Sequence, residues 1–220
     1  MGLMDKSTIL MYLMRAIVML VAIPVHEAAH AYVSAKLGDT TAKDYGRLTL
    51  NPVAHFDLMG ALCMILAGVG WAKPVPTNPM RFKNPKRGMA LTAAAGPVSN
   101  VLLAFLSIIV YKLVFYMAPL QVTTWQFVLL LLNYMASINI TLAVFNLLPI
   151  PPFDGSRIVN VFLPQRLYFK IMQYERYIFI GMFLMLVLGV LDTPLRYLNN
   201  LMWDLLLHAT GFVEMMLGLI

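Results

Sequence analysis

His26, Glu27 and His30 occur within the stretch IPVHEAAHAY (residues 23–32), and their types and spacing suit metal-assisted hydrolysis. Residues four apart lie on the same face of a helix, so His26 and His30 can direct two imidazole nitrogens at one metal ion. Glu27 is turned by about 100° from His26, so its carboxylate can act as a general base toward water at that ion. The H-E-x-x-H spacing therefore predicts a zinc site.

The setting of these three side chains strengthens the prediction. They lie toward the end of an almost uncharged run, residues 8–35, which is long enough to cross a membrane. Each ionisable side chain in such a run costs roughly 2–3 kcal/mol on insertion scales, and such groups usually mark a functional site. The same motif in a soluble helix would carry little weight, because exposed His and Glu residues cost little there.

A third metal ligand is expected, because catalytic zinc sites usually combine three protein ligands with one open position. His55 and His208 are candidates by residue type. Asp154, in NLLPIPPFDG (residues 146–155), is favoured because it follows a predicted span at the same depth as His30. The prolines of this stretch prevent a regular helix, which frees backbone groups beside the predicted site.

The composition is that of a membrane protein. Of the 220 residues 60% are hydrophobic and 12% are charged, whereas soluble domains have about 25% charged residues. We predict an all-α polytopic membrane protein with five to six transmembrane or re-entrant helices and a small β element between the first span and the second. The predicted segments are spans over 8–35, 89–117, 125–148 and 177–191, a spanning or interfacial helix over 195–219, a short buried or re-entrant helix over 58–71, and the β element over 42–50.

The organisation and orientation follow from the links between these runs. We expect one membrane domain over 1–220, with a catalytic core over about 8–160 and trailing helices over about 161–220. The links at 73–87 and 157–176 are basic, so the positive-inside rule places them, and the end that carries His30, on the cytoplasmic side. The net charge of +6 does not indicate nucleic acid, because no basic stripe is interleaved with aromatic residues.

Four stretches resemble the site-2 protease family of intramembrane zinc metalloproteases. They follow the order of the family's motifs: HEAAH at 26–30, GWAKPVPTNP at 70–79, GPVSN at 96–100 and NLLPIPPFDG at 146–155. The resemblance implies one Zn²⁺ bound by His26, His30 and Asp154, with Glu27 as the catalytic acid and base.

The resemblance also implies roles for residues around the metal. Asn146 would hold the substrate backbone or the oxyanion. Asn100 would form a hydrogen bond near the site, also toward substrate or oxyanion, or would serve helix packing. Gly96 would allow a close approach of two helices. GWAKPVPTNP resembles an extended substrate-binding strand, with a proline-rich connector as the alternative.

The implied function is hydrolysis of peptide bonds in or near transmembrane helices of membrane proteins, with the lipid bilayer as surroundings. We expect a multi-pass protein of the cell membrane whose active site faces the cytoplasm, similar to compact family members without PDZ or CBS domains. Phe153 stands where the family usually has Leu before Asp-Gly, which affects the shape of the pocket. The alternatives are a membrane metal-ion carrier and an inactive homologue acting as a chaperone, against which the intact Glu27 argues.

Overall fold

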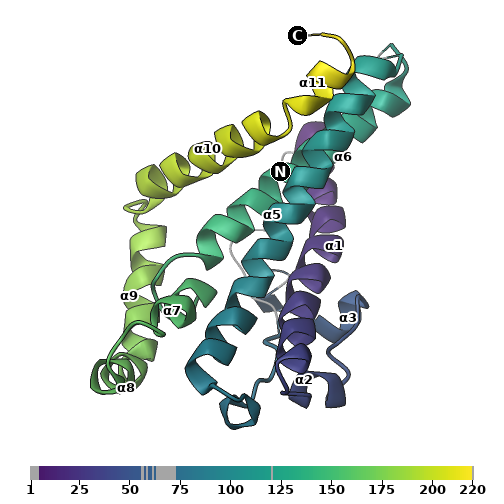
Figure 1. Cartoon of the computed structure of the whole chain (residues 1–220). Helices are drawn as coiled ribbons and strands as arrows, with labels where there is room; N and C mark the ends of the chain where they lie inside the picture. Colours follow the sequence, from purple (N-terminus) through teal and green to yellow (C-terminus); the bar gives the residue numbers. More distant parts are fainter. Residues whose placement is uncertain are drawn as a thin grey trace.

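Three long helices form the body of the molecule, which we describe from a computed structural model for residues 5–55, 57, 59–60, 62, 73–119 and 121–219. They are α1 (Lys6–Lys36), α5 (Pro85–Met117) and α6 (Thr123–Asn146), and they pack against one another in all three pairs (Figure 1). The shorter elements are α2 (Thr41–Asp44), α3 (Pro52–His55), the 3₁₀ turn η1 (Pro79–Arg81), α7 (Asp154–Val159), α8 (Gln165–Gln173), α9 (Glu175–Val187), α10 (Asp192–Ala209) and α11 (Phe212–Met216).

Alanines are among the most buried residues of the long helices, and many of the large apolar residues are exposed. Small side chains allow helix backbones to approach closely, which is how helices associate in lipid. The alanines that lie at these contacts are at most 3% exposed: Ala22, Ala31, Ala93, Ala104, Ala136 and Ala143. Leu13, Leu102 and Leu106 are more than half exposed, an arrangement that suits a lipid environment.

The predicted count of five to six spanning or re-entrant helices is not supported. Among the described residues three helices are long and apolar enough to cross a membrane, or four if α9 and the α10–α11 segment are taken as one span bent by 86°. With 13 residues, α9 is about 20 Å long, too short for a bilayer of about 30 Å. The chain turns at Gly189, whose φ of +72° favours glycine.

The predicted β element is also wrong. Within 42–50 the chain forms α2 and a turn, in which the Arg47 N–H donates to the Ala42 carbonyl oxygen at 2.8 Å and Gly46 has a φ of +68°. Local closure by these bonds replaces the extended backbone that a strand requires. Residues 73–78, part of GWAKPVPTNP, have no regular secondary structure. The short helix predicted for 58–71 falls largely outside the described residues.

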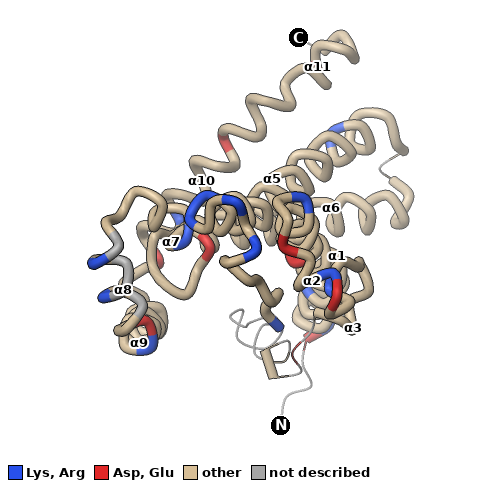
Figure 2. Tube along the Cα trace, turned by 60° about the horizontal axis from the view of Figure 1, so that its bottom comes forward, with Lys and Arg blue, Asp and Glu red and all other residues tan. Residues whose placement is uncertain are grey.

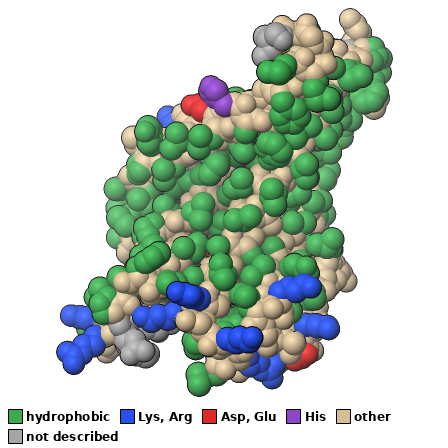
Figure 3. Space-filling view, viewed as in Figure 1, with side chains coloured by type: hydrophobic (Ala, Val, Ile, Leu, Met, Phe, Trp, Pro, Cys, Tyr) green, Lys and Arg blue, Asp and Glu red, His purple; other side chains and the backbone are tan. Residues whose placement is uncertain are grey.

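Basic side chains gather at one end of the long helices. In the space-filling view, Lys and Arg cluster at the end that holds α2 and α8, and hydrophobic side chains cover the middle (Figure 3). Figure 2 turns this end toward the reader and shows basic residues along α8. The distribution fits a membrane protein with one strongly basic face at the bilayer surface.

Asp39 joins three segments at this basic end. Its side chain is fully buried and accepts hydrogen bonds from the Ser34 hydroxyl at 3.1 Å, the Thr41 N–H at 3.0 Å and the Asn78 N–H at 2.7 Å. These bonds tie the end of α1 to α2 and to the segment before η1. Burial by itself favours the protonated acid, but the hydrogen bonds from Thr41, Asn78 and Ser34 outweigh it and lower the pKa of Asp39.

Replacing the Asp39 carboxylate tests this connection between α1, α2 and the segment before η1. We expect Asp39→Asn to lower the free energy of unfolding by about 1–3 kcal/mol, because the new amide N–H₂ faces donors that lose their acceptor. A lowered folded-state pKa stabilises the protein above the ordinary pKa of about 3.9, and this contribution disappears as the pH falls through the folded value. Thermal unfolding in detergent between acidic and neutral pH should therefore show that the stability of wild type falls more steeply with decreasing pH than that of the variant. Asp44→Asn, at an exposed carboxylate, is the control; an equal effect there would contradict the prediction.

Candidate metal centre

The two histidines of HEAAH lie near the basic end of α1 and face α5. His26 and His30 are each 8% exposed, and their Nε2 atoms lie 3.0 Å apart. Glu27 is half-buried on the neighbouring part of the helix surface. The predicted helical face is thus present, with both imidazoles directed at one point.

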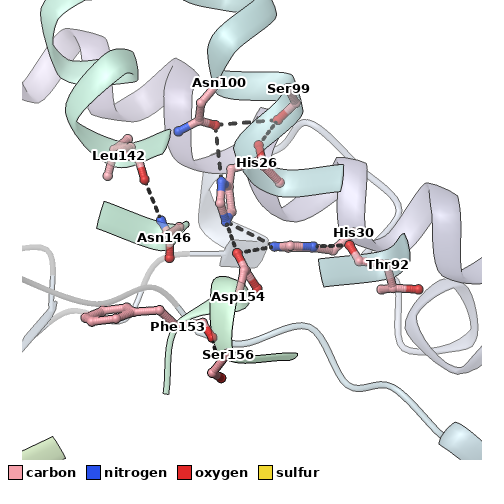
Figure 4. A network of polar contacts seen from close by, with 11 residues as sticks. His26, His30, Thr92, Ser99, Asn100, Leu142, Asn146, Phe153, Asp154 and Ser156 are labelled. Atoms are coloured by element: carbon pink, nitrogen blue, oxygen red, sulfur yellow. Dashed lines mark hydrogen bonds and ion pairs between the residues drawn. The ribbon is translucent and has the colours of Figure 1, made fainter. Parts of the chain in front are cut away.

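Helix α5 fixes the proton positions of both imidazoles. The Nδ1 of His30 lies 2.7 Å from the Thr92 carbonyl oxygen, and the Nδ1 of His26 lies 3.2 Å from Oδ1 of Asn100 (Figure 4). Both partners are oxygens that only accept, so each Nδ1 carries the proton and donates it. In the neutral rings each Nε2 then presents a lone pair, as a metal ligand requires.

Gly96 makes this contact between α1 and α5 possible. A Cβ atom at this position would lie 2.4 Å from Nε2 of His30 and 2.5 Å from Cε1 of His26, closer than non-bonded atoms can approach. The backbone of α5 therefore lies directly against the two rings. The predicted role of Gly96 in close helix approach is confirmed in these contacts.

Asp154 reaches the histidines from the other side. It is the first residue of α7, after α6 has ended at Asn146, and its Oδ2 lies 3.3 Å from Nε2 of both His26 and His30. Gly155 permits this path, because a Cβ there would lie 2.2 Å from the Leu147 carbonyl oxygen. Sequence inspection missed this requirement, for which the Asp-Gly pair was the available signal.

The environment keeps Asp154 ionised. Burial favours the protonated acid. When Nε2 of His26 and His30 is protonated, the hydrogen bonds that Asp154 accepts from these rings and their positive charge outweigh burial and hold the pKa of Asp154 well below its ordinary value. The carboxylate is therefore available as a negatively charged oxygen ligand near neutral pH.

The donor set fits a small divalent cation. The ligand atoms of His26, His30 and Asp154 all lie within 4.8 Å of one another. Ligands about 2.0–2.1 Å from a tetrahedral zinc ion are separated by about 3.3 Å, close to the observed separations of 3.0 and 3.3 Å. Two lone pairs and a carboxylate directed at one point repel one another unless a cation lies between them, so the arrangement is suited to zinc.

The other predicted residues lie around this cluster or away from it. Asn146 is half-buried near Asp154 (Figure 4), and its Nδ2 donates to the Leu142 carbonyl oxygen at 3.0 Å. His55 is buried in α3 against the Thr49 carbonyl oxygen, and His208 is exposed on α10. Among the described residues neither belongs to the group that could hold a metal ion, which consists of His26, His30 and Asp154.

An aromatic pair lies beside the loop that carries Asp154. The rings of Phe145 and Phe153 meet edge to face with their centroids 4.4 Å apart. Each precedes a predicted site residue, Asn146 or Asp154, so the pair joins the end of α6 to the start of α7. The phenylalanine that departs from the family's usual Leu therefore has a packing partner.

Comparisons with known proteins point to one family. The model of "Peptidase family M50" matches residues 114–189, which include Asn146 and Asp154. The "Putative zinc metalloprotease YwhC" of Bacillus subtilis is 40% identical over 195 residues, which cover 86% of this chain and 84% of that protein. "Putative zinc metalloprotease Rip2" of Mycobacterium tuberculosis is 33% identical over 141 residues, and that of Mycolicibacterium smegmatis is 28% identical over 144; each match covers 62% of this chain and 52% of the relative. No solved structure matches the chain.

Adding one methyl group at Gly96 tests the geometry. We expect Gly96→Ala to weaken zinc binding at least about tenfold, in the range seen when a metal ligand is displaced or disoriented, because the new Cβ must push both imidazoles away. Zinc retention after dialysis against a chelator series measures the change. Gly181→Ala is the matched control, since nothing lies within 4 Å of a Cβ there. Equal zinc retention in the Gly96 variant and wild type would contradict the geometry.

Proposed function

The chain belongs to peptidase family M50, and we propose that it is an intramembrane zinc metalloprotease with His26, His30 and Asp154 as zinc ligands and Glu27 as catalytic acid and base. One observation carries the assignment of the ligands. Three donor atoms from α1 and α7, more than a hundred residues apart in sequence, converge within a buried space of metal-binding size.

Zinc, when bound there, would supply Lewis-acid chemistry that activates water and polarises the peptide carbonyl. The protein's own contribution is to hold the ligands. Asn100 and the Thr92 carbonyl keep Nε2 of each histidine unprotonated and directed at the ion. We therefore assign Asn100 to the orientation of His26, which is a hydrogen bond near the site but is neither the substrate or oxyanion role nor the packing role expected from its motif.

Glu27 is assigned the proton transfers. It follows His26 directly and is turned by about 100° around the helix, so its carboxylate can approach the reacting water without replacing a ligand. It would accept a proton as the water oxygen attacks the carbonyl carbon. It would then donate that proton to the amide nitrogen as the C–N bond breaks, releasing a free amine and a carboxylic acid.

The substrate we propose is a transmembrane segment of a membrane protein. Its peptide bond must be unwound locally, because the carbonyl groups of an intact helix are hydrogen-bonded internally. Asn146 lies near Asp154 at the end of α6 (Figure 4), where its side chain can hold the unwound backbone or the oxyanion. The Phe145–Phe153 pair forms a rigid border beside it.

The proposed orientation places the metal at the cytoplasmic side of the cell membrane. The clustering of Lys and Arg at the end of the molecule that holds α2 and α8 supports it, since cytoplasmic loops carry an excess of basic residues. Cleavage would then occur near the cytoplasmic end of the substrate helix.

The decisive variant is Glu27→Gln, which keeps the side-chain shape but removes the base. We expect it to bind zinc like wild type while cleavage falls by about 10²–10⁴-fold, the usual contribution of a general acid–base group. The measurement is cleavage of a purified transmembrane reporter in detergent, together with metal content. Glu175→Gln, in α9, is the control.

The same variant separates the protease from its rivals. A metal-ion carrier needs ligands but no general base, and a chaperone needs neither, so both would be indifferent to Glu27→Gln. Undiminished cleavage in this variant would overturn the mechanism. Absence of cleavage in wild type, despite bound zinc, would favour a carrier or chaperone.

The third ligand is tested separately by Asp154→Ala. We expect a loss of zinc affinity of at least about a hundredfold, because removing a ligand costs more than disturbing its hydrogen-bond partner. Metal content after purification measures it, and His208→Ala, which alters an exposed histidine far from the cluster, is the control. If Asp154→Ala retains its zinc, while replacement of His55 or His208 by Ala removes it, Asp154 is not the third ligand.

A further inference from the structure

A second polar site lies at the far end of α5 from the metal centre. Lys112 is only 9% exposed, and its Nζ lies 2.8 Å from Oε1 of Glu214 in α11. Nζ also lies 3.4 Å from the Leu207 carbonyl oxygen in α10. An ionisable residue within a membrane-spanning helix is costly and usually marks a functional site.

The ion pair borders a cavity of about 360 Å³ between α5, α6, α10 and α11. Tyr111, Tyr116 and Trp203 also line it, and Asn133 lies on the side formed by α6. The Tyr116 side chain forms a hydrogen bond with the Glu214 carboxylate. The walls formed by Ile108, Leu132 and Ala136 are apolar. A ligand of matching chemistry therefore has one charged end and one apolar end.

The charges specify the polar end further. Lys112 has three N–H donors. Its Nζ lies 2.8 and 2.9 Å from the two carboxylate oxygens of Glu214, and its remaining contact, with the Leu207 carbonyl oxygen, is long at 3.4 Å. An anion could take the place of this carbonyl. A carboxylate has about four acceptor positions, so Glu214 can accept another donor. The cavity thus offers a donor for an anion and an acceptor for a cation side by side, with no net charge.

We propose that this cavity binds the headgroup of a zwitterionic phospholipid that carries a primary ammonium group. The phosphate would accept from Lys112, and the ammonium would donate to Glu214 and lie against the faces of Tyr116 or Trp203. A quaternary ammonium cannot donate a hydrogen bond to Glu214, so a headgroup that carries one lacks this contact. The acyl chains would extend along the apolar side of the cavity into the bilayer.

The position along the helices supports a lipid as the source of this chemistry. Lys112 lies five residues before the end of α5 at Met117, about 7–8 Å by the helical rise. That depth corresponds to the headgroup region when the apolar part of α5 spans the bilayer. Tyr and Trp residues are enriched at this depth in membrane proteins.

The test compares lipids on the delipidated full-length protein. Thermal unfolding and native mass spectrometry are measured with phosphatidylethanolamine, phosphatidylcholine, phosphatidylglycerol and soluble phosphoethanolamine. We expect phosphatidylethanolamine to bind about tenfold more tightly than the other two lipids, the equivalent of one charge-assisted hydrogen bond. No preference among the lipids overturns the proposal. Equal stabilisation by soluble phosphoethanolamine also overturns it, because the ligand is then not a lipid.

A charge swap separates lipid recognition from a purely structural ion pair. Lys112→Glu combined with Glu214→Lys keeps an ion pair but reverses its polarity, and should abolish the preference for phosphatidylethanolamine. The matched control is the swap of the exposed pair Arg81 and Asp44, 3.4 Å apart near the metal end. If the Lys112–Glu214 swap folds and keeps the preference, the pair is structural only. If that swap does not fold, the wild-type lipid series alone decides.

Discussion

The metal centre depends on the requirement that polar atoms inside an apolar helix bundle find partners. His26 and His30 each have a ring N–H that must donate in a region with little water. Helix α5 provides the acceptors, one from a side chain and one from its backbone. When these two N–H groups have acceptors, the opposite nitrogens keep free lone pairs. The same packing therefore satisfies buried donors and prepares the two proposed ligands.

This requirement fixes how the rest of the bundle is built. The acceptors on α5 reach the rings because Gly96 has no side chain between them. Asp154, the proposed third ligand, reaches the histidines because the chain passes over the end of α6, which Gly155 permits. Two glycines therefore control the separation of three ligand atoms, although neither contributes an atom to the cluster. The site is consequently sensitive to helix spacing as well as to ligand identity.

The parts of the site that the sequence predicts are those specified by side-chain type and spacing. HEAAH predicted two ligands on one helix face, and the Asp-Gly stretch directed attention to Asp154, which lies beside them. Thr92 could not be found in this way, because it acts through a backbone carbonyl that every residue has. The number of spans was overestimated because the apolar run 177–191 was counted as a span, whereas the helix it forms, α9, has only 13 residues and is too short to cross a bilayer. The prediction of a β element over 42–50 was wrong because local hydrogen bonds, such as that from the Arg47 N–H to the Ala42 carbonyl oxygen, close the chain into a turn.

Helix α10 shares a buried apolar cluster with α5 and α6. Leu206 of α10 belongs to the same buried cluster as Ala104, Ile108, Ala136 and Ile140 of α5 and α6. Ala104 is one helical turn from Asn100, the acceptor for His26. Because closely packed interiors transmit small displacements, the packing of α10 contributes to the spacing of α5 and α6. That spacing in turn sets how Asp154, after the end of α6, meets the histidines held against α5. The trailing helices are therefore structurally coupled to the metal centre, even though no ligand comes from them among the described residues.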